Sequence, residues 1–193
     1  MRRSTVARAT CTGAAYYGHA DIVKILLSRS FSPMNPLRRH KDLLHELDTI
    51  VSAVKDRGLA LQAIADTLKE FGNYRWVGLY DIDHSARLVR NIVWSGPGAP
   101  EYPTFPVSRG LTGAAIASRR TINVGNVAQD SRYLTAFGST QSEIIVPVLD
   151  KTGASVVGTI DVESEQRDAF SPEIERLLES CSERIGQLWF RQT

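Results

Sequence analysis

Apolar residues recur every three or four positions along two stretches in the first half of the chain, which is the spacing of helices with one buried face. The repeating positions are Leu43, Leu44, Leu47, Ile50, Val51 and Val54 in the first stretch and Leu61, Ile64, Leu68 and Phe71 in the second. Gly58 predicts a break between the two helices, and Gly72 predicts the end of the second. A third amphipathic helix is predicted after Ser171, because this capping residue is followed by Pro172 at the first helical position.

The pattern changes to that of strands from residue 76 onward. The predicted strands are residues 76–82, 88–94, 121–124, 142–149 and 154–163. Residues 109–117 indicate a tight turn that leads into a short helix. Residues 125–141 are polar and without a period, so they predict a long loop of the kind that often covers a binding site. Because neighbouring strands are joined by short turns, we expect antiparallel pairing and the α+β class.

The turn between the two strongest strands decides which side chains share a face of the sheet, because a shift of one residue turns every side chain over. A three-residue loop would place Gly153 in the left-handed conformation and would pair Asp150 with Ala154. Counting back along the strands, this register puts Glu143 directly opposite Asp161.

A two-residue loop would instead put Glu143 opposite Ile160. We favour the first register, in which Glu163 also lies on the face of Asp161 and three carboxylates come together. Like charges this close raise at least one pKa unless a cation lies among them. Such a cluster is a candidate site for an ammonium group, a metal or an internal Arg or Lys. The alternatives are that this face is solvated or that the acids pair with arginines.

The composition excludes several classes of protein. The chain has 193 residues, a formal charge of +2 and well-mixed acids and bases, so no nucleic-acid-binding footprint is present. No apolar run approaches the length that spans a bilayer, and no membrane partner is expected. Cys11 and Cys181 lie far apart, which suggests neither a disulfide framework nor a zinc site and favours a cytoplasmic setting. The four histidines are scattered, so neither a metal nor another cofactor is predicted: His19, His40, His45 and His84.

The first part of the chain differs from the rest. Residues 13–27 resemble part of an ankyrin repeat, with two short helices around a Gly-His turn. One partial repeat cannot bury its own apolar face, so this piece is interpreted as a remnant or a fused fragment. Residues 30–36 contain two prolines and predict a linker. We therefore divide the chain into an extension, residues 1–36, and a domain, residues 37–193.

Four segments together resemble the GAF domain, and within that superfamily they are most similar to free methionine-(R)-sulfoxide reductase. The segments are residues 75–80 (RWVGLY), 105–113 (FPVSRGLTG), 142–147 (SEIIVP) and 158–164 (GTIDVES). The resemblance covers roughly residues 43–188. It implies a central antiparallel sheet with a helical layer on one side and a ligand pocket under loops on the other.

The resemblance also implies which residues hold the ligand. The reductase family binds its substrate with an aromatic pair on the first strand and with acids on the hairpin. The matching positions are Trp76, Tyr80, Glu143, Asp161 and Glu163. Glu163 replaces an aspartate of the family. For the two aromatic residues, packing in the core is the alternative interpretation.

The thiol chemistry of that family is not supported by the sequence. The family cysteines match Thr112 and positions near Tyr102 and near Ala136, and none of these is cysteine. A thiolate is needed to attack the sulfoxide, and neither Thr nor Ala supplies one. Cys181 lies on the apolar stripe of the last helix, where we expect it to serve in packing. No catalytic residue is therefore assigned.

These observations predict a GAF sensory or regulatory module that binds a small molecule with an amino group. Two alternatives stay open. One is a reductase-like enzyme with altered catalytic residues, and the other is a dimerisation module. A homodimer through the N-terminal and C-terminal helices of the domain is expected from the resemblance, since GAF domains commonly pair in this way.

Overall fold

A computed structural model describes residues 36–135 and 138–191 of the chain. The ankyrin-like fragment and the linker lie outside the described residues, so the division at residue 36 stays a prediction. The elements are α2 (Pro36–Ala53), α3 (Arg57–Gly72), β1 (Trp76–Asp83), β2 (Leu88–Ser95), β3 (Thr104–Pro106), α4 (Gly110–Ser118), β4 (Ile122–Val124), β5 (Ser142–Leu149), β6 (Val156–Ser164) and α5 (Pro172–Ile185). Two 3-10 turns, Val127–Gln129 and Gly186–Phe190, complete them.

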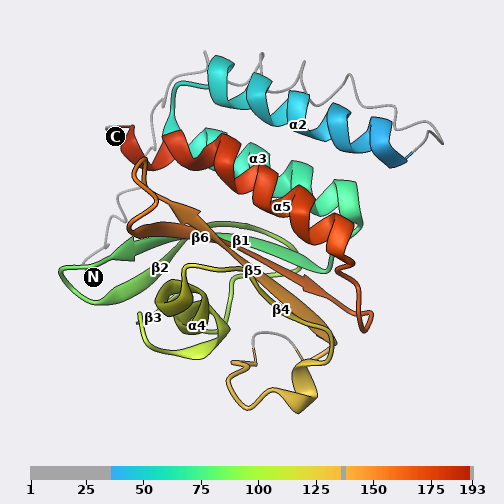
Figure 1. Cartoon of the computed structure of the whole chain (residues 1–193), viewed down its shortest axis with the longest axis vertical. Coiled ribbons are helices and arrows are strands. Elements are labelled where there is room, and N and C mark those ends of the chain that lie inside the picture. The colour runs from blue at the N-terminus through green and yellow to red at the C-terminus, as the bar shows by residue number, and fades with distance from the viewer. Residues whose placement is uncertain (1–35, 136–137, 192–193) are drawn as a thin grey trace, which may run out of the picture. The chain divides into compact units, whose positions relative to one another are not determined.

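The strands form one antiparallel sheet in the order β3-β2-β1-β6-β5-β4. Figure 1 shows α2, α3 and α5 on one face of this sheet and α4 with its flanking loops on the other. The predicted α+β class, with helices on one side and loops on the other, is confirmed. No helix in the described ranges is both long and apolar enough to cross a membrane.

The prediction that Gly58 separates the first two helices is wrong. The separation comes from Asp56, whose carboxylate accepts a hydrogen bond from the backbone N–H of Leu59 at 2.8 Å and so caps α3. Gly58 lies in the first turn of that helix. Gly72 is the last residue of α3, and Asn73 follows it in the left-handed conformation with a φ of 48°.

The predicted hairpin register is also wrong, by two residues. Glu143 lies opposite Glu163, and Asp161 lies opposite Ile145. The reason is a longer turn, because the backbone N–H of Asp150 bonds the carbonyl of Ser155 at 2.8 Å, and the register shifts again between Val148 and Leu149.

The side chain of Asp150 holds this wider turn. Its Oδ1 accepts hydrogen bonds from the backbone N–H groups of Thr152 and Ala154 at 3.1 and 3.0 Å. Because side chains alternate along a strand, a shift of two residues changes the pairing but not the face. Glu143, Asp161 and Glu163 therefore still share one face of the sheet.

Candidate functional site

A small cavity of about 40 Å³ lies on the sheet face that α4 and the loops cover. All five predicted site residues line it. Glu143 comes from β5, Asp161 and Glu163 come from β6, and the aromatic residues come from β1. The full lining is Trp76, Tyr80, Pro100, Tyr102, Phe105, Leu111, Thr112, Leu134, Glu143, Asp161 and Glu163.

The indole of Trp76 reaches the cavity because the strand carries a glycine two positions further on. A Cβ at Gly78 would lie only 2.0 Å from Trp76 Cη2, so any larger residue there would displace the ring. The indole Nε1–H donates to the carbonyl of Gly98 at 3.1 Å. The ring centroid of Tyr80 lies 6.3 Å from that of Trp76 and 5.9 Å from that of Phe105. The two predicted aromatic residues thus both pack in an apolar cluster and line the cavity.

The three carboxylates are buried, with exposed fractions of 9% for Glu143, 4% for Asp161 and 2% for Glu163. Thr112 donates its hydroxyl to Asp161 Oδ2 at 3.1 Å, and Thr140 donates to Glu163 Oε2. Asp161 Oδ1 has no hydrogen-bond partner among the residues that the structure describes. An unpaired buried carboxylate oxygen is costly, because burial removes its hydration. The hydroxyl of Thr159, which also has no hydrogen-bond partner among the described residues, lies close enough to favour the ionised form of Asp161.

No Lys, Arg or His is among the described residues that line the cavity. Arg75 lies outside this lining, and its charge favours the ionised form of Glu163. Its guanidinium pairs with Glu165 at 3.2 Å. The described cavity lining therefore holds acids without a basic side chain among them. Within the described ranges, no group of His, Cys, Asp and Glu side chains is placed to hold a metal ion.

Burial strongly raises the pKa values of the three carboxyl groups. It raises the pKa of Asp161 and that of Glu163 to about 7 each. The hydroxyls of Thr159 and Thr112 oppose the shift of Asp161, and the hydroxyl of Thr140 opposes that of Glu163. Burial and the charges of the other two acids raise the pKa of Glu143 well above its ordinary value. Burial and the same three acids also raise the pKa of the Tyr80 phenol. Near neutral pH, the empty cluster therefore retains protons.

We predict that the free energy of unfolding of the empty protein falls as the pH rises from about 5 to about 8. In the unfolded chain these acids lose their protons near pH 4, whereas in the folded protein Asp161 and Glu163 keep theirs until about pH 7. Their contribution to stability is therefore complete below about pH 4 and is lost as the pH rises through about 7. Urea unfolding across this range measures it. A flat profile would contradict the clustering of these acids.

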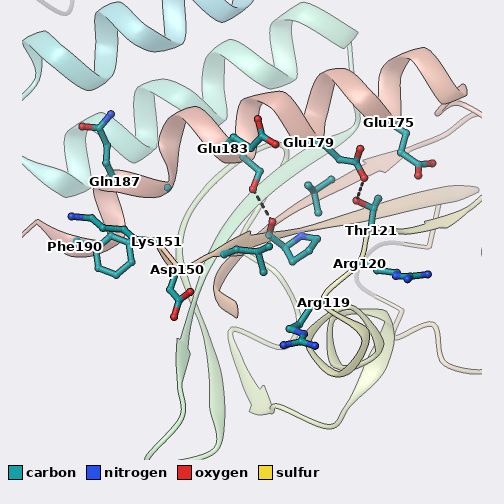
Figure 2. A pocket seen from close by; sticks show the side chains of 15 residues that line it. Arg119, Arg120, Thr121, Asp150, Lys151, Glu175, Glu179, Glu183, Gln187 and Phe190 are labelled. Atoms are coloured by element: carbon teal, nitrogen blue, oxygen red, sulfur yellow. Dashed lines mark hydrogen bonds between the residues drawn. The ribbon is translucent and has the colours of Figure 1, made fainter. Parts of the chain in front are cut away.

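A larger groove, of about 700 Å³, lies between α5 and the strip formed by β5 and the end of α4. Figure 2 shows Glu175, Glu179 and Glu183 along its α5 wall, with Arg119 and Arg120 on the opposite side. Solvent screens the charges of such an open groove, and no buried charge there lacks a partner.

Two of the groove's polar groups are also used within the protein. Thr121 donates to Glu179 at 2.7 Å, and Ser182 donates to the carbonyl of Pro147 at 2.7 Å (Figure 2). The groove is therefore larger than the acidic cavity, but none of its described polar side-chain atoms is buried without a hydrogen-bond partner. The smaller cavity is the better candidate site.

The family model of the GAF domain matches residues 56–189, and the chain belongs to this family. Among curated proteins it is similar to GAF domain-containing protein A of Dictyostelium discoideum, with 27% identity over 140 residues, or 72% of this chain and 85% of that protein. The GAF resemblance seen in the sequence motifs is thereby confirmed.

Solved structures of similar fold include two reductases. The free methionine-R-sulfoxide reductase from Neisseria meningitidis in complex with its substrate is 25% identical, with a TM-score of 0.76 over 84% of this chain and 95% of that one. The type II enzyme from Thermoplasma acidophilum is 29% identical, with a TM-score of 0.64 over 74% of this chain and 94% of that one.

The positions that the resemblance matches to the family cysteines fall in different places. Thr112 and Tyr102 line the cavity, and Ala136 lies outside the described residues. Cys181 lies on α5 with no exposed surface, on the helix-covered face of the sheet, and burial raises the pKa of its thiol to about 12. Sequence reasoning treated Thr112 only as a lost cysteine and missed its hydrogen bond to Asp161.

Other lining residues were also missed. They come from β3, from α4 and from loops, where no hydrophobic period indicates which way a side chain points. These residues are Phe105 in β3, Leu111 in α4, and Pro100 and Leu134 in loops. Phe105 and Leu111 lie in the motif FPVSRGLTG. The family resemblance of this motif was therefore the available signal that these two residues lie near the site.

Proposed function

We propose that this GAF domain is a sensory or regulatory module that binds a small molecule through a cationic amino group. The observation that carries the proposal is the convergence of three buried carboxylates, one with an unpaired oxygen, in a cavity whose described lining has no basic side chain. An ammonium group provides both the missing charge and the missing hydrogen-bond donors. Trp76 and Tyr80 are placed to contact the apolar part of such a ligand.

The cavity has to enlarge when a ligand binds. A volume of about 40 Å³ is close to the space of one water molecule, which occupies about 30 Å³ in the liquid. Binding would therefore move a wall, and the movement would report occupancy. The walls on the sheet are fixed by strand pairing, so the loops and α4 are the parts that we expect to move.

The similar solved structures support this choice of ligand chemistry. One is described as bound to its substrate, and free methionine sulfoxide carries an amino group. The fold of this chain is therefore of a kind that accommodates such a molecule. The identity of the ligand in the present protein belongs to the proposal.

Calorimetric titration of the full chain with amino acids, methionine sulfoxide included, tests the proposal. Each amino compound is paired with its hydroxy analogue, in which a hydroxyl replaces the amino group. We expect heat from at least one amino compound and at least tenfold weaker binding of its hydroxy partner. Affinity is expected to rise as the pH passes about 7, because Asp161 and Glu163 must lose their protons to receive an ammonium group. Equal affinity within every pair would contradict the proposal.

A reductase-like activity is the second candidate, because two reductases are among the similar structures. Turnover of free methionine sulfoxide with a thiol reductant separates the two functions. Activity that disappears in Cys181→Ser would overturn the assignment of this buried thiol to packing. Activity that persists would require a group other than the thiol of Cys181.

A homodimer through α2 and α5 remains part of the proposed function. α5 packs on the sheet, and α2 packs over α5 and α3 on the same side (Figure 1). Leu37 at the start of α2 is 69% exposed. Such an arrangement could transmit occupancy of the cavity to a partner domain. A monomer in sedimentation at high concentration would exclude it.

A further inference from the structure

A second hollow lies directly beside the acidic cavity, on the outer side of α4. It has a volume of about 660 Å³ and is open to solvent. Its lining is Val107, Ser108, Arg109, Gly110, Gly113, Ala114, Ile116, Ala117, Ser131, Arg132 and Leu134. Leu134 lines both this outer hollow and the inner cavity.

Leu134 therefore borders both spaces, alongside residues of α4. Leu134 packs onto the start of α4 at Gly110, where a Cβ would lie 2.8 Å from Leu134 Cδ1. Gly110 also has a φ of 76°, so a larger residue there would be strained as well as crowded. By contrast, the wall formed by Trp76 is tied by its hydrogen bond to Gly98. Leu134 lies in a loop, so its side chain is free to move without disturbing the strand pairing of the sheet.

The two spaces are lined by ionisable side chains of opposite kind. The inner cavity has three acids, whereas the outer hollow has Arg109 and Arg132. The guanidinium of Arg109 lies 4.8 Å from the ring centroid of Tyr102, and no carboxylate in the described part of the chain pairs with it. Arg132 is already paired with Asp130 at 2.6 Å. Arg109 is thus the better-placed cation for an anionic group of a ligand.

Much of the lining of the outer hollow is apolar and made of small side chains. It consists of one side of α4, with Gly113, Ala114, Ile116 and Ala117, together with Val107. A ligand lying along it would contact α4 while its ends reach opposite charges. A free α-amino acid has its ammonium and carboxylate on the same carbon, so it cannot place them in both compartments.

We infer that the two hollows are compartments of one site, and that its ligand carries an ammonium group and a carboxylate separated by an apolar segment, as in a short peptide with a free N-terminus. The inference rests on the proposed function and specifies its ligand. The ammonium group lies with Asp161 in the inner cavity, and the carboxylate meets Arg109 in the outer hollow. Leu134 moves aside to let the apolar segment pass.

Titrations of the full chain with four related compounds test this inference. They are leucine, leucyl-alanyl-alanine, the C-terminal amide of that tripeptide and its N-acetyl form. We expect the tripeptide to bind at least tenfold more tightly than leucine. The amide should lose that gain, because it has no carboxylate for Arg109, and the N-acetyl form should not bind.

Variants separate a contact from a structural effect. Arg109→Gln should reduce tripeptide affinity to that of leucine, while Arg109→Lys should retain part of the gain. Arg119→Gln, an exposed arginine after α4, is the matched control and should alter neither. Leucine binding as tightly as the tripeptide would overturn the inference and leave the proposed function standing. Absence of binding by every free amine would overturn both.

Discussion

Asp161→Asn is expected to make the empty protein more stable at pH 8 and to weaken amine binding at the same time. Raising the pKa of this carboxyl from 3.8 to about 7 corresponds to a penalty of about 4 kcal/mol once the folded group is ionised. The amide removes the charge but still buries a polar group, so we expect a net gain of roughly 1–3 kcal/mol. Urea unfolding at pH 8 measures it.

The same substitution removes the charged acceptor for the ligand. A hydrogen bond to a charged group contributes about 1.5–3 kcal/mol, so the affinity for an amine should fall at least tenfold. Stability and binding therefore change in opposite directions, which distinguishes a functional cluster from ordinary packing. Near pH 5, where the wild-type carboxyl is protonated, the gain in stability should be small. Loss of stability at both pH values would contradict the argument.

A suitable control is Asp83→Asn on the same sheet. Asp83 is an acid at the end of β1, and the hydrogen bonds from Ala86 and Ser85 lower its pKa. Its ionised form is favoured in the folded protein, so its loss should destabilise slightly, the opposite sign to Asp161→Asn.

Trp76→Ala is expected to have the largest effect on stability. The side chain is 1% exposed, and Ala would remove both its packing and the hydrogen bond from its Nε1–H to Gly98. Comparable truncations of buried aromatic residues cost about 3–5 kcal/mol. The matched control is Trp94→Ala on β2, where the side chain is 38% exposed and a cost of about 1 kcal/mol or less is expected. Equal losses in the two variants, measured by urea unfolding, would show that Trp76 is not an essential part of the core.

The sequence pattern predicted the long elements of the fold well. The run of Ser142–Leu149 and the capped start of α5 at Ser171 were each visible from local signals. The short strand β3 was missed, because three residues that end in Pro106 show no alternation and are ordered only by pairing with β2. The hairpin register failed because the hydrogen bonds of the Asp150 side chain, which widen the turn, leave no trace in hydrophobic periodicity.

The candidate site was partly predictable for a simple physical reason. The acids lie on strands, and alternation keeps Glu143, Asp161 and Glu163 on one face even when the register is wrong by two residues. Thr140 and Leu134 lie in a loop, and their positions depend on tertiary contacts that no local rule specifies. The aromatic residues were found through the family resemblance, and the space left by Gly78 explains why that motif holds Trp76 over the cavity.

The hydrogen bond from Ser182 to the carbonyl of Pro147 also bears on how this protein behaves in a crowded solution. The last strand of the sheet, β4, covers only Glu143, Ile144 and Ile145, so the rest of β5 is left at an open edge. Exposed strand edges recruit strands from other molecules and start aggregates. Here Pro147 offers no N–H, and its carbonyl is already engaged. At Pro147 the open edge therefore offers an incoming strand neither a backbone donor nor a free carbonyl.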